Sequence, residues 1–258
     1  MTAGTDLGTV AGWLRSAARI VVLTGAGVST ESGIPDFRGP QGVWTTNPGA
    51  ERLSSIEHYV ADPEVRVQAW RGRLNHPAWT AEPNAAHRAI ADLERLGRLH
   101  VLVTQNIDGL HARAGSSPEL IIEIHGTIRE FTCLSCGDRG PMGDALARVR
   151  AGEEDPHCLA CGGLLKSATI SFGQALVPGD LERAERAAAS CDLFLAAGTS
   201  LAVYPVARLP EIALRAGARL IVVNQQPTPY DPHADAVLRG LAGEVLPALV
   251  SAAFASPS

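Results

Sequence analysis

The sequence lacks the features that would place it in or across a membrane. No apolar run among its 258 residues approaches the ~20 residues needed to span a bilayer. The segment from Met1 to Val10 has neither the basic region nor the apolar core of a secretory signal. Internal repeats and low-complexity segments are also missing. We therefore expect a cytoplasmic protein with no membrane partner.

An excess of positive charge is missing as well. Asp and Glu number 27 against 22 Lys and Arg, which gives a net charge of −5 with neutral histidines. This balance argues against specific nucleic-acid partners and against anionic membranes, and it is weakly compatible with basic protein substrates. The length allows one large α/β domain, or a main domain that carries an insertion.

Cysteine is scarce, and its spacing is informative. Four of the five cysteines form two Cys-x-x-Cys pairs, Cys133 with Cys136 and Cys158 with Cys161, whereas Cys191 is expected to be a small buried apolar residue. This usage favours thiolate metal ligation over a disulfide framework. Two such pairs supply the four sulfur ligands of a tetrahedral shell around one Zn²⁺ ion. Because no position stays open for water, the ion is expected to be structural. A redox role for one pair is the alternative, although it leaves the second pair unexplained.

The usual dinucleotide fingerprint is incomplete. After an apolar run at residues 19–23, Gly25 and Gly27 match its first two glycines, but Thr30 stands at the third position and Gly33 follows three residues later. The two glycines let backbone N–H groups approach an anion and tolerate positive φ. The two glycines are equally compatible with a plain tight turn and with a nucleotide-binding loop.

The next residues favour a functional loop. Asp36, Phe37 and Arg38 place an acid, an aromatic ring and a base between Gly33 and Gly39, where a structural turn needs none of them.

Hydrophobic patterns predict an alternating α/β chain with a helical insertion. Residues 43–79 hold three tryptophans, with Asp62-Pro63 as a helix start, and residues 168–173 are extended. Asn84 is the expected N-cap of the following helix. Buried strands are predicted at residues 19–23, 100–104, 120–124, 192–197 and 219–223, and helices at 7–18, 84–98, 142–152, 178–190 and 234–250.

Polar residues follow these strands at the carboxyl ends, where an open parallel sheet binds ligands. Asn106 and Asp108 follow the second strand and His125 the third. His125 is a general-base candidate, because its ordinary pKa of about 6.5 lies near neutral pH. The alternatives are a structural histidine, and an Asx turn or helix cap formed by Asn106 and Asp108. His111 and His157 lack this placement and are expected to be structural.

Six ordered motifs resemble those of sirtuins, the NAD-dependent protein lysine deacylases. The motifs are residues 25–38 (GAGVSTESGIPDFR), 104–111 (TQNIDGLH), 123–126 (EIHG), the four paired cysteines, 198–201 (GTSL) and 223–224 (VN). The resemblance implies a Rossmann-like, doubly wound parallel sheet built from residues 1–38, 84–125 and 167–258. It also implies a small domain that combines the helical insertion, residues 39–83, with a zinc ribbon, residues 126–166.

The resemblance further implies a reaction in which the acyl group of an acyl-lysine protein or peptide moves to ADP-ribose, with release of nicotinamide from NAD. His125 would deprotonate a ribose hydroxyl, and Asn106 would hold a water molecule and the ribose. Ile107 and Asp108 would bind the nicotinamide carboxamide, and Gln105 the ribose hydroxyls.

The remaining NAD contacts follow from the same resemblance. Phe37 would shield the reactive carbon from water on a loop that closes over the cofactor. The substrate peptide is expected to add as a strand near Phe172, Gly173 and Val203. The other NAD contacts implied are Gly25, Ala26, Gly27, Thr30, Ile34, Asp36, Arg38, Gly198, Thr199, Ser200, Asn224 and Gln225.

Two departures from the family pattern concern specificity. Ser167-Ala168 and Gln174 replace a proline-led segment and a glutamate, and Trp70 and Arg73 stand where members that remove acidic acyl groups carry Tyr-x-x-Arg. Arg73 could pair with an acyl carboxylate, or both residues could only pack or face solvent. We favour deacetylation by a monomer, with longer or acidic acyl groups open. The competing functions are an ADP-ribosyltransferase and a non-catalytic NAD sensor.

Overall fold

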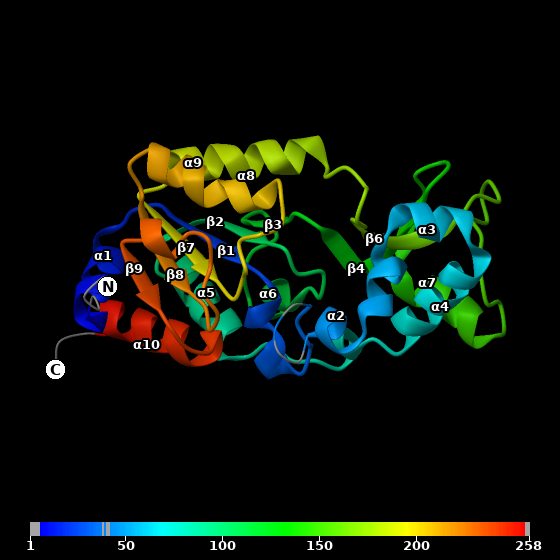
Figure 1. Ribbon diagram of the computed structural model, residues 1–258, viewed down its shortest axis with the longest axis horizontal. Coiled ribbons are helices and arrows are strands. Elements are labelled where there is room, and N and C mark those ends of the chain that lie inside the picture. Colours follow the sequence, from blue (N-terminus) through cyan, green and yellow to red (C-terminus); the bar gives the residue numbers. More distant parts are fainter. Residues whose placement is uncertain (1–5, 38, 40–41, 256–258) are drawn as a thin grey trace.

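Six parallel strands form the larger of two sheets in the structure, a computed structural model that describes residues 6–37, 39 and 42–255. The strands lie in the order β3-β2-β1-β7-β8-β9 (Figure 1). In such a sheet a ligand crevice lies outside the carboxyl ends of the strands, where the strand order reverses, here between β1 and β7. The strands are β1 (Ile20–Thr24), β2 (Leu99–Thr104), β3 (Ile121–Glu123), β7 (Leu193–Ala197), β8 (Arg219–Val223) and β9 (Ala236–Leu238).

Alternate side chains of β1 enter two separate cores, as the pleat of a strand requires. Ile20 and Val22 belong to a core shared with α1, α5 and α10, whereas Val21 and Leu23 belong to a core shared with α8 and α9. Figure 1 shows α8 and α9 on one side of the sheet and α1 and α10 on the other, so the predicted doubly wound fold is confirmed. These helices are α1 (Leu7–Ser16), α5 (Ala85–Arg95), α8 (Pro178–Ser190), α9 (Leu209–Arg215) and α10 (Ala242–Phe254).

The predicted helix over residues 234–250 is wrong in its first part. Ala236–Leu238 forms β9, which pairs with β8 and makes the sheet one strand wider than expected, and α10 begins only at Ala242. A strand of three residues is too short to show a hydrophobic period that distinguishes strand from helix. The conformation of Ala236–Leu238 is therefore set by its pairing with β8. Helix α9 had no predicted counterpart. The five predicted strands and the four earlier helices are confirmed to within a few residues.

The smaller sheet is antiparallel and has the order β5-β4-β6. It packs with the helical insertion around one core that contains Trp70, Met142 and Leu165 together with Cys133 and Cys158. The insertion and the cysteine module therefore form one packed unit. Its elements are β4 (Gly126–Cys133), β5 (Arg139–Pro141), β6 (Leu165–Thr169), α2 (Val43–Thr46), α3 (Ile56–Ala61), α4 (Pro63–Leu74) and α7 (Met142–Arg150), with 3₁₀ turns at Pro48–Ser54 and Pro77–Trp79.

Two predicted helix starts are confirmed by their side-chain bonds. The Asp62 carboxylate accepts the Glu64 N–H at 2.9 Å before Pro63 opens α4. The Asn84 side chain accepts the Ala86 N–H at 2.9 Å before α5. Both follow the N-cap rule that a short polar side chain satisfies an otherwise unpaired helix N–H group.

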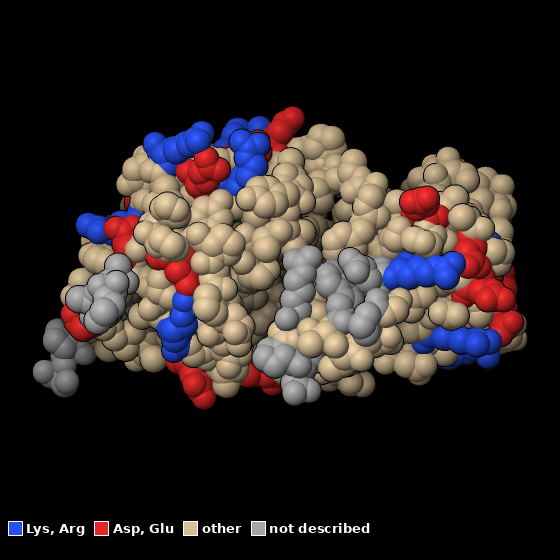
Figure 2. All heavy atoms as spheres, in the orientation of Figure 1, with Lys and Arg blue, Asp and Glu red and all other residues tan. Residues whose placement is uncertain are grey.

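The two sheets lie at opposite ends of an elongated molecule (Figure 1). On the face shown in Figure 2, charged side chains gather over these two ends, and the surface between them carries few. The division into two domains at the predicted boundaries stays a proposal, and residue 167 lies inside β6. Within the described part of the chain, no helix has the length and apolar character needed to cross a membrane.

Candidate functional site

Gly25 and Gly27 allow the loop after β1 to touch the loop after β7. A Cβ atom would lie 2.8 Å from the Gly198 carbonyl oxygen if placed on Gly25, and 2.9 Å from it if placed on Gly27. Both N–H groups already donate within the protein, Gly25 to Ala197 at 3.1 Å and Gly27 to Gly198 at 2.9 Å. Positive φ occurs instead at Gly33, with 84°, and at Gly198, with 58°. The two glycines are therefore needed for close loop packing, not for the free N–H groups or positive φ that the sequence suggested.

Ser29 is the centre of a buried cluster that sequence reasoning missed. Its hydroxyl donates to Asp108 Oδ2 at 2.8 Å and accepts from Asn106 Nδ2 at 3.0 Å, and the residue is only 1% exposed. His87 Nε2 lies 3.4 Å from the same hydroxyl oxygen. Serine is ordinary in a glycine-rich turn, so the sequence held no signal for this role.

Asn106 and Asp108 reach this cluster from the end of β2. The second proton of Asn106 Nδ2 goes to the Gly25 carbonyl at 3.2 Å, which leaves Asn106 Oδ1 with no partner among the described residues. Asp108 Oδ1 accepts the Leu110 N–H at 2.9 Å, where the short helix α6 (Leu110–Arg113) begins. Asp108 thus forms the Asx turn that the sequence offered as an alternative. Its bond to Ser29 also links it directly to the glycine loop.

His125 lies between β3 and β4 and is oriented by Gln105. His125 Nδ1 is 3.1 Å from the Gln105 main-chain oxygen, and the His125 carbonyl accepts the Ile170 N–H at 2.7 Å. A carbonyl oxygen can only accept, so Nδ1 carries the proton and Nε2 is the basic nitrogen of the neutral ring. Burial lowers the pKa of His125, partly opposed by the Gln105 bond, and this keeps the ring neutral at pH 7.

Gln105 also ties the end of β2 to the end of β7. Its side-chain Nε2 donates to Thr199 Oγ1 at 2.8 Å, and its main-chain N–H donates to the Thr24 carbonyl at 2.9 Å. Gly198 continues the row by donating its N–H to Val223 at 2.9 Å. The ends of four neighbouring strands are therefore held in one connected edge.

The outer residues of this edge are less enclosed. Ser200 and Gln225 are exposed, and Ile107 and Asn224 are half-buried. Asn224 keeps its side chain near the backbone, because its Nδ2 donates to the Gln226 carbonyl at 2.9 Å.

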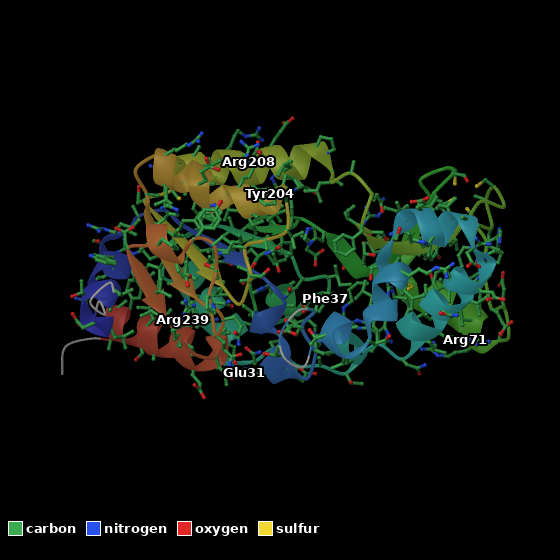
Figure 3. All side chains as sticks on the ribbon, viewed as in Figure 1. Glu31, Phe37, Arg71, Tyr204, Arg208 and Arg239 are labelled. Carbon is green, nitrogen blue, oxygen red and sulfur yellow. The ribbon has the colours of Figure 1, made fainter. Side chains whose placement is uncertain are left out.

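The loop after Gly33 is held in a turn by a hydrogen bond between two of its own residues. Asp36 accepts the Gly39 N–H through its carboxylate at 3.0 Å, and Phe37 is 45% exposed. Figure 3 shows Phe37 beside α2, between the two ends of the molecule. Thr30 donates its hydroxyl to the Gly27 carbonyl at 3.1 Å. Ala26 and Ile34 are half-buried, and Arg38 lies outside the described residues.

The predicted peptide-binding segment already has one occupied edge. Phe172 donates its N–H to Ser54 at 2.8 Å and accepts the Ile56 N–H at 3.0 Å. Gly173, with φ of 81°, has no main-chain partner among the described residues. Val203 lies after β7 in a half-buried turn. The main-chain N–H and carbonyl of Phe172 are thus already used, so a peptide strand has to pair with main-chain groups that follow Phe172.

Glu123 is a second residue that sequence reasoning missed. It lines a small cavity together with Asn106, Asp108 and His111, and burial raises the pKa of Glu123 to about 7. His111 Nε2 lies 3.0 Å from the Thr24 hydroxyl, and burial lowers the pKa of His111 well below its usual value. His111 is thus a buried neutral residue, and its structural role stays a prediction. His157 lies by the cysteines, with Nδ1 2.9 Å from the Gly162 carbonyl.

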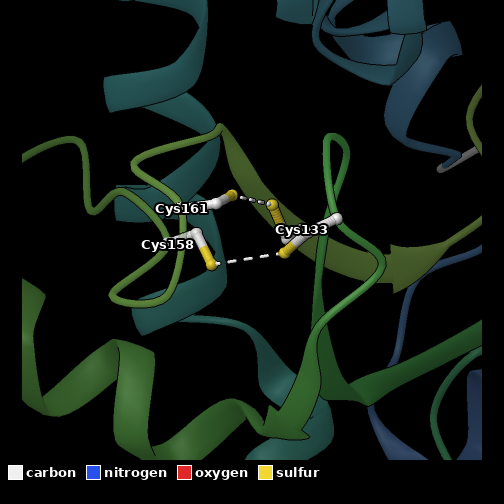
Figure 4. Close-up of side chains that lie close together, drawn as sticks. Cys133, Cys158 and Cys161 are labelled. Atoms are coloured by element: carbon white, nitrogen blue, oxygen red, sulfur yellow. Dashed lines mark hydrogen bonds between the residues drawn. The ribbon is translucent and has the colours of Figure 1, made fainter.

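The four paired cysteines converge in the small unit (Figure 4). All four sulfur atoms lie within 4.8 Å of one another, with 3.6 Å between Cys133 and Cys161 and 3.7 Å between Cys136 and Cys158. A tetrahedron with zinc–sulfur bonds of about 2.3 Å has sulfur–sulfur edges of about 3.8 Å. The N–H groups of Ser135 and Gly163 point at the sulfurs of Cys133 and Cys161, both at 3.4 Å. This donor set fits one structural zinc ion.

A doubly wound sheet whose strand ends are joined by polar side chains, combined with a four-cysteine ribbon, defines a nucleotide-binding type of α/β protein with a metal module. The Sir2 family model matches residues 25–205. The chain therefore belongs to the Sir2 family.

Similar proteins cover nearly the whole chain. The NAD-dependent protein deacetylase 2 of Streptomyces coelicolor is 54% identical over 90% of this chain and 96% of its own length. The NAD-dependent protein deacetylase 1 of Pyrobaculum aerophilum is 42% identical over 95% of this chain and 94% of its own length. A Sir2 enzyme solved with a deacetylated p53 peptide and 3′-O-acetyl ADP-ribose has a TM-score of 0.88 at 32% identity, over 96% of this chain and 98% of that one.

Proposed function

We propose that this chain is an NAD-dependent protein lysine deacetylase, which transfers the acetyl group of acetyl-lysine to ADP-ribose and releases nicotinamide. The observation that carries the proposal is the neutral His125 ring, with Nε2 as its base, held by Gln105 at the same edge as Asn106 and the glycine loop. Relatives over 40% identical bear the deacetylase name, and a Sir2 structure contains the acetylated product and a deacetylated peptide.

NAD supplies the activated ribose and the leaving nicotinamide when it is bound. The chain's own part is to hold a proton acceptor at the ribose hydroxyl, and we assign that role to His125 Nε2, since the Nδ1 proton is engaged by Gln105. We assign to Asn106 Oδ1 a ribose or water contact, because both protons of its Nδ2 are already used. Ile107 and Asp108 are assigned to the nicotinamide carboxamide.

The remaining contacts assigned to NAD surround the same edge. The loop that carries Asp36, Phe37 and Arg38 is proposed to cover the ribose and exclude water, and the exposed ring of Phe37 suits that role. Exposed Ser200 and half-buried Asn224 have room for the adenosine half. The other assigned contacts are Gly25, Ala26, Gly27, Thr30, Ile34, Gln105, Gly198, Thr199 and Gln225.

The substrate peptide is proposed to pair with Gly173. This main chain is unpaired in the described residues, whereas Phe172 already pairs with residues 54 and 56. Val203 is assigned to the other side of the peptide. An added strand gains affinity from main-chain bonds with little sequence demand.

The proposal also covers the oligomeric state and the cellular location of the protein. We propose a monomer that acts in the cytoplasm. The cytoplasmic location is supported by five cysteines that form no disulfide, which suits a reducing compartment. Zinc is assigned a structural role, because four sulfur ligands leave no open position for catalysis.

An ADP-ribosyltransferase and an NAD sensor are the competing functions, and one experiment separates the three. The protein is incubated with NAD and an acetyl-lysine peptide, and all products are resolved by mass spectrometry. A deacetylase gives deacetylated peptide, nicotinamide and O-acetyl-ADP-ribose in equal amounts. Peptide-independent labelling of protein with ADP-ribose would identify the transferase, and intact NAD with every acyl peptide would leave the sensor.

A further inference from the structure

Arg129 joins three segments at the point where the small unit meets the large sheet. It lies on β4, which runs between the two ends of the molecule (Figure 1). Its Nε and Nη2 donate to the Asp108 carbonyl at 3.1 and 2.8 Å, and Nη2 also donates to the Ala78 carbonyl at 2.9 Å. One side chain thus links β4, the loop after β2 and the 3₁₀ turn at Pro77–Trp79.

The guanidinium of Arg129 packs between an aromatic ring and a glycine. Its Cζ lies 5.2 Å from the centre of the Trp79 ring, a distance at which a cation is attracted to the ring. A Cβ atom placed on Gly109, whose φ is 71°, would lie 3.3 Å from Arg129 Nε. The left-handed turn after Asp108 therefore needs glycine both for its backbone and for the room that the guanidinium takes.

Arg129 forms no ion pair with a carboxylate in the part of the chain that the structure describes. Two other arginines near it do, since Arg113 binds Glu82 at 2.7 Å and Arg139 binds Glu130 at 2.6 Å. Arginine stays charged at neutral pH, so the charge of Arg129 is directed at main-chain carbonyls. A hydrogen bond from a charged donor is stronger than one between neutral groups. The contact with Asp108 is therefore stronger than an ordinary main-chain hydrogen bond.

Asp108 is the residue whose orientation depends on this contact. Its carbonyl accepts from Arg129, and its carboxylate accepts from the Ser29 hydroxyl at 2.8 Å and from the Leu110 N–H at 2.9 Å. The carbonyl and the carboxylate of Asp108 are thus both fixed by hydrogen bonds. Loss of the bonds to Arg129 would free the peptide group between Asp108 and Gly109 to rotate, and the carboxylate would lose its fixed direction.

We propose that Arg129 is a positioning residue, which holds Asp108 in the orientation that binds the nicotinamide end of NAD. This inference rests on the proposed function, in which Asp108 is assigned to the nicotinamide carboxamide. Within the described residues, the side chain of Arg129 donates only to main-chain carbonyls, so it acts through Asp108 and needs no contact with NAD. The nicotinamide half of the cofactor should therefore depend on Arg129, whereas the ADP-ribose half should not.

The test compares the binding of NAD with that of ADP-ribose, which lacks nicotinamide, by isothermal titration calorimetry of the full chain. Arg129→Met keeps a long stem beside Trp79 but removes the charge and the donors. We expect its affinity for NAD to fall about tenfold, as for the loss of a hydrogen bond from a charged group, and its affinity for ADP-ribose to stay unchanged. The matched control is Arg139→Met, which removes an exposed arginine of β5 and should leave both affinities unchanged.

A second variant and a second measurement test the same step. Arg129→Lys keeps the charge, but one ammonium group replaces the planar fork, so the loss of NAD affinity should be smaller than in Arg129→Met. This variant carries the comparison if Arg129→Met does not fold. Hydrogen exchange reports on Asp108 directly, because the Leu110 N–H donates to its carboxylate. The Leu110 amide should exchange faster in both Arg129 variants and at the parent rate in Arg139→Met.

The outcomes separate a positioning role from a purely structural one. Equal losses of affinity for NAD and ADP-ribose would show that Arg129 only supports the fold, and would overturn the inference. Unchanged affinity for NAD, or unchanged exchange at Leu110, would overturn it as well. A parent protein that binds NAD but leaves an acetyl-lysine peptide intact would contradict the deacetylase function and leave the comparison of the two ligands valid. Absence of NAD binding in the parent protein would contradict both.

Discussion

His125 Nδ1 lies 3.1 Å from the main-chain oxygen of Gln105, and this contact fixes the proton on Nδ1 and the base on Nε2. A general base contributes about 10²- to 10⁴-fold to a rate. We therefore expect His125→Ala to lower kcat for deacetylation by a factor in that range. Steady-state kinetics with an acetyl-lysine peptide measures the loss.

The matched control for this variant is His58→Ala, because His58 is an exposed histidine on α3. It should retain the parent kcat, and both variants should keep the parent Tm. Full activity in His125→Ala would exclude this ring as the base.

The pH dependence of catalysis follows from the direction of the His125 shift. Burial lowers the pKa of His125 below its ordinary value of about 6.5, so the neutral, basic form is present at pH 7 and is lost only in more acidic solution. We expect kcat/KM to fall below about pH 6.5 and to be flat from there to pH 8. A profile of kcat/KM with the acid midpoint above pH 7 would disagree with a buried base.

Gly198 should tolerate alanine poorly. A Cβ there would lie 2.4 Å from the Val28 nitrogen, and φ is 58°. The left-handed backbone alone costs an alanine about 1–2 kcal/mol, so Gly198→Ala should lower the free energy of unfolding by at least about 2 kcal/mol. Urea unfolding measures this change.

The control for Gly198→Ala is Gly12→Ala in α1, where a Cβ meets nothing within 4 Å. It should raise stability by about 0.5–1 kcal/mol, because alanine restricts the unfolded chain and favours a helix. Equal effects at the two glycines would mean that the loops after β1 and β7 do not depend on close packing.

Removal of zinc should loosen the small unit before the large sheet. Cys133 and Cys158 belong to the same core as Trp70 and Met142, so loss of their metal leaves that core without its cross-link. Cys133→Ser should lose the metal, reducing bound zinc from one ion per chain, as elemental analysis can measure.

Hydrogen exchange locates the effect of that change. The amides of β4 and β6 should lose protection in Cys133→Ser, whereas those of β1 and β7 should keep it. Unchanged protection of β4 in the metal-free protein would show that the ribbon does not need its zinc.

Much of the large sheet could be predicted because its central strands are buried on both faces. Residues 20–23 of β1 and Leu193–Ala197 are continuous apolar runs, and polar or glycine residues mark where each one ends. The shared edge of parallel strands then places His125 near Asn106 without further information. By contrast, β9 has only three residues, and its conformation depends on its neighbour β8.

The site residues that sequence reasoning missed share a physical reason. Ser29 matters because Asp108 and Asn106, about eighty positions away, both reach its hydroxyl. Glu123 has a raised pKa because folding buries it, which no local pattern records.

The fate of an isotopically labelled acetyl group tests the central claim most directly. The protein is given NAD and a peptide whose acetyl-lysine carries ¹³C in the acetyl group, and the labelled products are identified early in the reaction. We predict that the label appears in O-acetyl-ADP-ribose, with one nicotinamide released for each acetyl group removed. Labelled free acetate as the first product, with NAD intact, would contradict the account.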